Sequence, residues 1–195
     1  MNCLLLGGAP NVGKTGTIIR LYFDLLDRLN INTLQDQKKL PQEVHKTPKG
    51  KIPNDFMWIL EIQDQEHKTI RIIINTAADD TKSINAFKKF FDDNFGEKGY
   101  DILISPIRDD FNKPNSRYRN LFLTKIPINN TGDFILEIPC GEANINGVRR
   151  TALEWYQDKI DDLIEHILKN APFNLLASSR LKRNCNYRKH NILSL

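Results

Sequence analysis

The sequence predicts an α/β domain, a three-layer arrangement with a sheet of about five mostly parallel strands and helices on both faces. Two observations predict it. Short unbroken apolar runs, typical of parallel strands buried on both faces, alternate along the chain with longer segments whose apolar residues recur at helical spacing. The 195 residues, 40% hydrophobic and 27% charged, suit one soluble globular domain of ordinary size.

The amino-terminal half begins with a strand and a helix and continues with a hairpin. The apolar run at residues 3–6 predicts the first strand, and residues 17–29 carry apolar side chains at helical spacing. Residues 56–62 and 69–74 predict two further strands, and the short polar stretch between them predicts a hairpin. The preceding stretch, 31–55, is long, polar and interrupted by prolines, and such a loop is usually functional or disordered.

The carboxyl-terminal half continues the alternation of helix and strand. Helical spacing predicts a helix over 84–95, and apolar runs predict strands at 101–105 and 134–138, the second of which is expected to stop at Pro139. A last helix is expected over about 150–168.

In such sheets, ligands bind beyond the carboxyl ends of the strands, so the connections that follow those ends are expected to converge on one site. These connections come after Leu6, Ile74, Ser105 and Ile138.

The charge distribution divides the chain into a domain, residues 1–170, and a basic tail, residues 171–195. The whole chain has a net charge of +4, and the tail carries basic residues and no acidic one, so the domain itself is nearly neutral. The tail could bind an acidic partner or nucleic acid, or it could be a poorly ordered solubilising end. Its basic residues are Arg180, Lys182, Arg183, Arg188 and Lys189.

Composition also bears on the compartment. No apolar run approaches the roughly 20 residues that span a bilayer, and the start of the chain lacks the pattern of a signal peptide, so no membrane insertion is expected. Cys3, Cys140 and Cys185 lie far apart and form no metal-binding or disulfide pattern. We therefore expect a cytoplasmic protein with free thiols.

The stretch between the first strand and the first helix carries a phosphate-binding motif. Residues 8–15 read GAPNVGKT and match G-x-x-x-x-G-K-[ST] at every fixed position. Backbone N–H groups of such a loop, together with the helix N-terminus, bind phosphate oxygens. Gly8 and Gly13 allow a closeness of approach that a Cβ would obstruct, Lys14 supplies an ammonium for the β and γ phosphates, and Thr15 a hydroxyl for Mg²⁺. The expected binding set is Gly8, Ala9, Pro10, Asn11, Val12, Gly13, Lys14, Thr15 and Gly16.

On this motif the sequence resembles the P-loop NTPase superfamily, most closely over residues 1–30. The resemblance implies a P-loop NTPase-like sheet, a bound nucleoside triphosphate with Mg²⁺, and a catalytic role for Lys14. The hairpin followed by Asn75, Thr76, Ala77 and Ala78 is also similar to the D-T-A-G-like switch segment of small GTPases. Asn75 and Ala78 depart from that pattern, because they replace its aspartate and glycine.

The base is left open. The nearest string to the guanine-reading motif N-K-x-D is Asn112-Lys113-Pro114-Asn115, which ends in Asn and lies well past the end of the preceding strand. We expect ATP rather than GTP only because ATP is the more abundant nucleotide.

A Mg²⁺-nucleotide site usually takes a carboxylate from the end of a second strand, where this chain has Asn75. Asp79 and Asp80 follow a few residues later and could bind the metal, or they could cap the following helix. Arg108, Arg117 and Arg119 could neutralise phosphate charge, or they could be solvated surface residues.

The sequence thus predicts a nucleoside-triphosphate-binding protein with Mg²⁺-dependent hydrolysis of ATP or GTP. One alternative is a nucleotide-gated binding module with little turnover, which the departures at Asn75 and Ala78 favour. Another is a small-molecule kinase whose substrate would bind the 31–55 stretch, although that stretch has no acceptor-binding motif. The same stretch could instead act as a lid that responds to the nucleotide.

Overall fold

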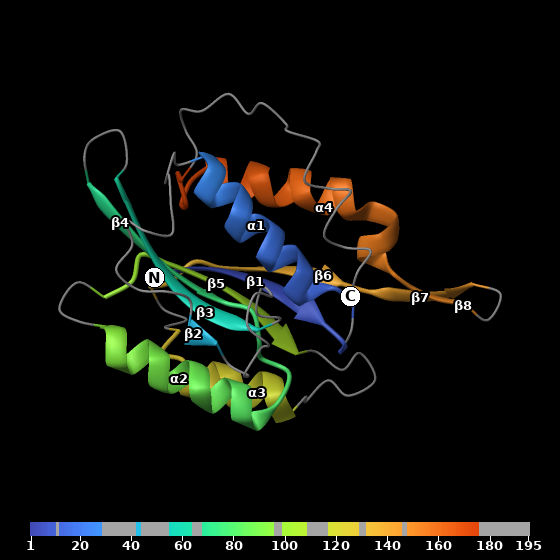
Figure 1. Ribbon diagram of the computed structural model, residues 1–195, viewed down its shortest axis with the longest axis horizontal. Helices are drawn as coiled ribbons and strands as arrows, with labels where there is room; N and C mark the ends of the chain where they lie inside the picture. Colours follow the sequence, from blue (N-terminus) through green and yellow to red (C-terminus); the bar gives the residue numbers. More distant parts are fainter. Residues whose placement is uncertain are drawn as a thin grey trace.

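The computed structural model describes residues 1–10, 12–28, 42–43, 55–63, 68–95, 99–108, 117–128, 132–145 and 148–175. Its main sheet has the strand order β2-β3-β4-β5-β1-β6 (Figure 1). The strands are β1 (Asn2–Gly8), β2 (Gln42–Glu43), β3 (Phe56–Gln63), β4 (Thr69–Asn75), β5 (Ile102–Arg108) and β6 (Ile135–Cys140). The helices are α1 (Lys14–Arg28), α2 (Thr81–Phe95), α3 (Arg117–Lys125) and α4 (Ala152–Lys169).

The pairing confirms the α/β class and the mostly parallel sheet. Strands β4, β5, β1 and β6 are parallel neighbours, whereas β3 is antiparallel to β4 and the two-residue β2 is antiparallel to β3. The predicted hairpin is therefore β3–β4. Strand β1 is paired on both sides, with β5 and with β6, and it is the strand that leads into the phosphate-binding motif.

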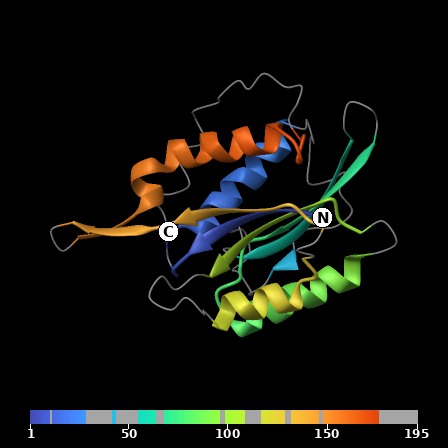
Figure 2. The same ribbon diagram turned by 180° about the vertical axis from the view of Figure 1, so that it is seen from behind.

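Two helices cover each face of the sheet. Helices α1 and α4 lie on one face, and α2 and α3 lie on the other (Figures 1 and 2). Alternate residues of β1 supply the two cores: Leu4 and Leu6 belong to the cluster that includes Ile18 of α1, while Cys3 and Leu5 belong to the cluster that includes Phe87 of α2. Because side chains alternate across a strand, an unbroken apolar run is what a sheet covered on both faces requires.

Two predicted boundaries differ from the structure. The strand predicted to stop at Pro139 continues through it to Cys140. Strand β6 pairs with β1 alone among the described strands, and an edge strand tolerates proline because the N–H of that residue is not needed for pairing. The packed domain extends to Leu175, past the predicted limit at 170, because Phe173 and Leu175 are buried in the core on the α1–α4 side. The rest of the predicted basic tail lies outside the described residues.

Some elements lacked a sequence signal. Helix α3 was not predicted, nor was the hairpin of β7 (Glu142–Ile145) and β8 (Val148–Thr151), which follows β6 directly and extends away from the body of the molecule (Figure 1). Of the 31–55 stretch, the structure describes β2 and Asp55, and β2 extends the sheet at β3.

Arg71 of β4 caps the C-terminal end of α2. The Arg71 guanidinium donates hydrogen bonds to the carbonyl oxygens of Asn94 (2.7 Å), Phe95 (2.7 Å) and Gly99 (3.1 Å). It also lies over the ring of Tyr100, 4.8 Å from the ring centroid. The last carbonyls of a helix have no partner within the helix, so Arg71 satisfies groups that would otherwise depend on water.

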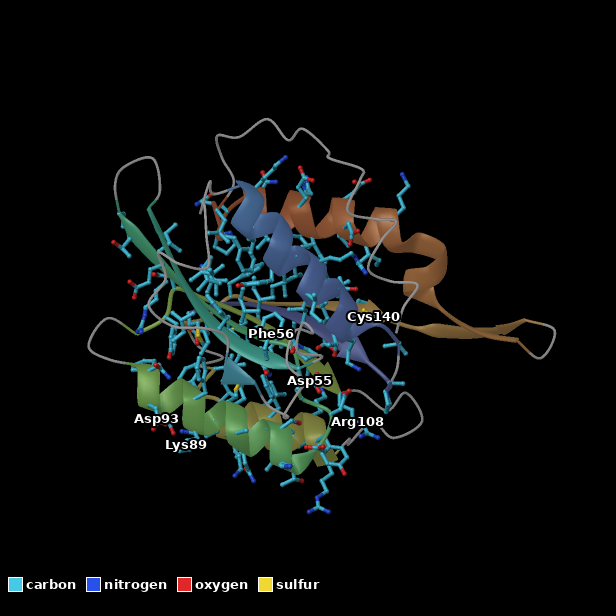
Figure 3. The ribbon with its side chains drawn as sticks, viewed as in Figure 1. Asp55, Phe56, Lys89, Asp93, Arg108 and Cys140 are labelled. Atoms are coloured by element: carbon cyan, nitrogen blue, oxygen red, sulfur yellow. The ribbon has the colours of Figure 1, made fainter. Side chains whose placement is uncertain are left out.

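We expect Arg71→Ala to lower the free energy of unfolding by about 2–4 kcal/mol, because several charge-assisted hydrogen bonds disappear together. Urea denaturation measures this loss. Lys89→Ala is a suitable control, since Lys89 pairs only with Asp93 on the outer side of α2 among its described contacts (Figure 3) and should cost less than about 0.5 kcal/mol. Equal losses in the two variants would contradict the capping role of Arg71.

Candidate functional site at the loop of residues 8–15

The ends of three parallel strands meet at the start of the loop formed by residues 8–15. Gly8, the last residue of β1, lies in register with Arg108 of β5 and with Cys140 of β6. Figure 3 shows Arg108 and Cys140 at this edge of the sheet. The segment after β4 joins them through the contacts described below, so the carboxyl ends of β4, β5, β1 and β6 lie together. The connection after β5 lies outside the described residues, and the connection after β6 leads into the β7–β8 hairpin, so the convergence of all four connections on one site stays a prediction.

Two glycines of the loop have conformations that a side chain would oppose. Gly8 has a φ of 155°, and a Cβ added there would lie 2.3 Å from the carbonyl oxygen of Cys140. Gly13 has a φ of 95°. Residues with a Cβ rarely adopt such backbone angles. Glycine is therefore needed at both of these motif positions for the backbone path of the loop itself.

Lys14 is the first residue of α1, and its ammonium is turned back into the loop. Its Nζ donates hydrogen bonds to the carbonyl oxygens of Gly8 (2.9 Å) and Ala9 (2.6 Å), and it lies 3.4 Å from Oδ1 of Asp79. The side chain is only 3% exposed, whereas that of Asp79 is 45% exposed. Burial lowers the pKa of Lys14 from its ordinary value, and the Asp79 carboxylate opposes this shift by favouring the charged ammonium.

Thr15 ties the loop to the end of β4. Its Oγ1 donates a hydrogen bond to the carbonyl oxygen of Thr76 (2.8 Å). Because β5 lies between β1 and β4, the two connected strands are about 10 Å apart, and the first turn of α1 bridges that gap. Since the Thr15 hydroxyl uses its hydrogen in this bond, its oxygen retains acceptor capacity of the kind that Mg²⁺ requires.

Thr76 carries the same connection on to β3. Its hydroxyl accepts a hydrogen bond from the N–H of Phe56 (2.7 Å) and donates one to the carbonyl oxygen of Phe56 (3.2 Å). A chain of hydrogen bonds therefore runs from Thr15 through Thr76 to the first residue of β3.

Asn75 occupies the position where a strand-end aspartate was expected, and its amide is used inside the sheet. The side chain is fully buried, and Nδ2 donates to the carbonyl oxygen of Ala77 (2.9 Å) and to Oγ of Ser105 (3.0 Å). Its Oδ1 accepts from the N–H of Ala77 (3.2 Å). An aspartate could not replace these two donors, so the amide is explained by the packing between β4 and β5.

The two aspartates that follow have different surroundings. Oδ1 of Asp80 accepts a hydrogen bond from the N–H of Ser83 (2.7 Å), and the Ser83 hydroxyl donates to the carbonyl oxygen of Asp80 (3.0 Å), which is the arrangement of an N-cap on α2. Asp79 instead faces Lys14, and its carbonyl oxygen accepts a hydrogen bond from Nη1 of Arg108 (2.6 Å). Asp79 is therefore the carboxylate that the fold brings to the loop of residues 8–15.

Of the three arginines considered from the sequence, Arg108 contacts the site. Its guanidinium also lies over the ring of Tyr118, 4.6 Å from the centroid. Arg119 forms a two-point ion pair with Glu137, at 2.8 and 2.6 Å, and Arg117 is exposed at the start of α3.

The remaining predicted loop residues have mixed placements. Val12 is fully buried in the core cluster on the α1–α4 side and anchors the loop, whereas Gly16 is exposed on the first turn of α1. Ala9 contributes its carbonyl to Lys14, and Asn11 lies outside the described residues. Sequence reasoning gave no site role to Thr76, Tyr118 or Cys140. The carbonyl oxygen of Cys140 occupies the place that a Cβ on Gly8 would need, and such a backbone position leaves no signal in residue type.

Within the described part of the chain, no group of three or more His, Cys, Asp or Glu side chains is arranged to hold a metal ion by itself. Among the helices described, none has the length and apolar character needed to cross a membrane. Comparison of the chain with protein-family models, with curated proteins and with solved structures finds no match. The site is therefore interpreted from its own geometry.

We expect Asn75→Asp to destabilise the protein by about 3 kcal/mol or more at neutral pH, since it places a charge among buried acceptors and removes two donors. Part of the loss should be recovered at acidic pH, where a protonated carboxyl can donate once. Chemical denaturation at both pH values measures this. Asn85→Asp, at an exposed position of α2 whose Oδ1 accepts from Lys125, makes the same change and should be nearly neutral. Similar effects in both variants would contradict the role given to Asn75.

Proposed function

We propose that this protein is a P-loop NTPase-like protein that binds a nucleoside triphosphate with Mg²⁺ at residues 8–15 and hydrolyses it. The observation that carries the proposal is the position of Lys14. A complete G-x-x-x-x-G-K-T sequence connects a central parallel strand to a helix N-terminus, and the motif lysine is buried against the loop it belongs to. This is the context that gives the motif its phosphate-binding chemistry.

The residues present also suit a phosphate ligand. An ammonium that is 3% exposed needs anionic or carbonyl partners, and Asp79 supplies the negative charge next to it. A terminal phosphate could supply the same charge in place of the Asp79 carboxylate, since both offer negatively charged oxygens to the ammonium. The helix N-terminus and the ammonium would then favour the same anion.

The Mg²⁺ that the motif implies would be held by Thr15 and by one carboxylate. Mg²⁺ in nucleotide sites usually keeps several waters and takes one or two protein oxygens together with the phosphates, so a site with few protein ligands is sufficient. When bound, the ion would neutralise phosphate charge. Asp79 is the favoured carboxylate, because Asp80 caps α2 through its own carboxylate.

A second candidate function is a nucleotide-gated binding module with little turnover. The observation that favours it is the use of Asn75 inside the sheet, which leaves the end of β4 without the usual acid. Turnover distinguishes the two functions: phosphate release with water as the acceptor supports an NTPase, and tight binding without release supports the module.

Lys14→Ala should weaken binding of ATP or GTP by about a hundredfold or more while leaving the fold intact, because the ammonium is the principal charge that the loop offers to phosphate. Titration calorimetry with non-hydrolysable analogues of both nucleotides, in the presence of Mg²⁺, measures the affinity. Lys88→Ala removes the same charge from a half-buried position of α2, where Lys88 pairs with Asp92, and should leave the nucleotide affinity unchanged. If the wild type binds neither nucleotide, or if Lys14→Ala binds as tightly as the wild type, the proposed function is wrong.

Asp79→Asn and Thr15→Ala should each reduce the gain in nucleotide affinity that Mg²⁺ provides, by about tenfold, since each removes a metal-binding oxygen or its charge. Asp80→Asn should leave the Mg²⁺ response unchanged, because asparagine caps a helix as well as aspartate does. The measurement is nucleotide affinity with and without Mg²⁺. A normal Mg²⁺ response in both Asp79→Asn and Thr15→Ala would rule out these two residues as metal ligands.

A further inference from the structure

The ion pair between Asp79 and Lys14 leaves one carboxylate oxygen poorly satisfied. Oδ1 of Asp79 lies 3.4 Å from the Lys14 ammonium. This oxygen is buried, and among the described residues it accepts no hydrogen bond of ordinary geometry. A carboxylate oxygen that is removed from water without a hydrogen bond is costly, so a better partner could replace this contact.

The ammonium has closer partners than the carboxylate has. Lys14 Nζ donates hydrogen bonds to the carbonyl oxygens of Gly8 and Ala9 at 2.9 and 2.6 Å, both shorter than its distance to Asp79. The side chain of Lys14 is almost fully buried, whereas that of Asp79 is about half exposed. Lys14 is therefore fixed on its own loop, and the Asp79 carboxylate is the member of the pair that can exchange its partner.

Asp79 would act in opposite ways on a phosphate with and without a metal ion. Without Mg²⁺, a phosphate that takes the place beside Lys14 leaves the carboxylate next to another anion, and like charges at this range repel each other. With Mg²⁺, the carboxylate can turn to the ion, which takes carboxylate oxygens together with phosphate oxygens. The same side chain thus opposes a metal-free phosphate and favours a metal-bound one.

We propose that Asp79 competes with phosphate for Lys14 and so makes nucleotide binding conditional on Mg²⁺. This inference rests on the proposed function, because it concerns the nucleotide bound at residues 8–15. It adds that the ligand-free protein discriminates against the metal-free nucleotide. The neighbouring Asp80 lacks this role, because its carboxylate accepts a hydrogen bond from the N–H of Ser83 at 2.7 Å and caps α2.

The test compares the affinity of a non-hydrolysable triphosphate in excess Mg²⁺ and in EDTA, by titration calorimetry at fixed ionic strength. Asp79→Asn should bind the metal-free triphosphate about tenfold more tightly than the wild type, because the competing charge is gone. Its affinity for the Mg²⁺ complex should change little, since the loss of the competitor and the loss of an ion ligand oppose each other. The gain in affinity from Mg²⁺ therefore falls about tenfold.

Two further variants separate competition for Lys14 from metal binding alone. Thr15→Ala should also reduce the gain from Mg²⁺, but through weaker binding of the Mg²⁺ complex and without a rise in metal-free affinity. Asp80→Asn makes the same change one residue along the chain and is the matched control. It should behave as the wild type under both conditions, because asparagine caps a helix as well as aspartate does.

The outcomes are separable. If the wild type binds the Mg²⁺ complex, and Asp79→Asn binds the metal-free triphosphate no more tightly than the wild type, the competing role of Asp79 is wrong and the proposed function stands. An equal rise in Asp80→Asn would also overturn the inference, because the effect would not depend on the contact with Lys14. If Asp79→Asn does not fold, Asp79→Ser removes the same charge and is judged by the same criterion. Failure of the wild type to bind the Mg²⁺ complex of an ATP or a GTP analogue overturns both proposals.

Discussion

The buried ammonium of Lys14 is the constraint around which this end of the molecule is organised. A charge so far removed from water is tolerated only with partners, and here they come from three places: the carbonyls of Gly8 and Ala9, and the carboxylate of Asp79. To supply the two carbonyls, the backbone of the loop must direct them towards the start of α1, and the positive φ angles of Gly8 and Gly13 permit this path. The connection after β4 must also reach across β5.

The same contacts indicate how a ligand would act on the fold. In this structure the protein's own carbonyl and carboxylate oxygens surround the ammonium, so an incoming phosphate would compete with Asp79 for it. Asp79 belongs to the short connection between β4 and α2, which is tied to β5 through Arg108 and to β3 through the hydrogen bonds of Thr76 with Phe56. Ligand binding at the loop would therefore change the environment of Phe56 at the start of β3, directly after the 31–55 stretch. Under our proposals, phosphate binding at Lys14 and displacement of the β4–α2 connection are therefore thermodynamically coupled.

Much of the fold follows from local patterns. The motif and its flanking apolar runs correctly predicted β1, α1 and the loop between them, and the alternation of buried runs and helical spacing predicted the sheet and its cover on both faces. What the sequence could not supply are choices made by tertiary contacts. Asp79 and Asp80 are chemically equal neighbours, and only the start of α2 separates the capping residue from the one beside Lys14. From the sequence, Asn75 reads as a replacement for a catalytic-site aspartate. The structure shows that its amide donates hydrogen bonds to Ala77 and Ser105, which an aspartate could not do. The predicted strand was wrongly ended at Pro139. Proline is tolerated there because β6 is an edge strand, and the order of the strands is not encoded in any local pattern.

The central claim is that residues 8–15 bind phosphate and that the ligand displaces Asp79 from Lys14. The most direct measurement is a titration followed by ¹H–¹⁵N correlation spectra of the whole chain, with Mg²⁺ and a non-hydrolysable triphosphate as the ligand. Our account predicts that the largest saturable shifts occur at the amides of Gly8, Gly13, Lys14 and Thr15, and that a second group at Thr76 to Asp80 moves with the same apparent Kd. Saturable shifts confined to other parts of the chain, or no shifts at millimolar ligand, would contradict it.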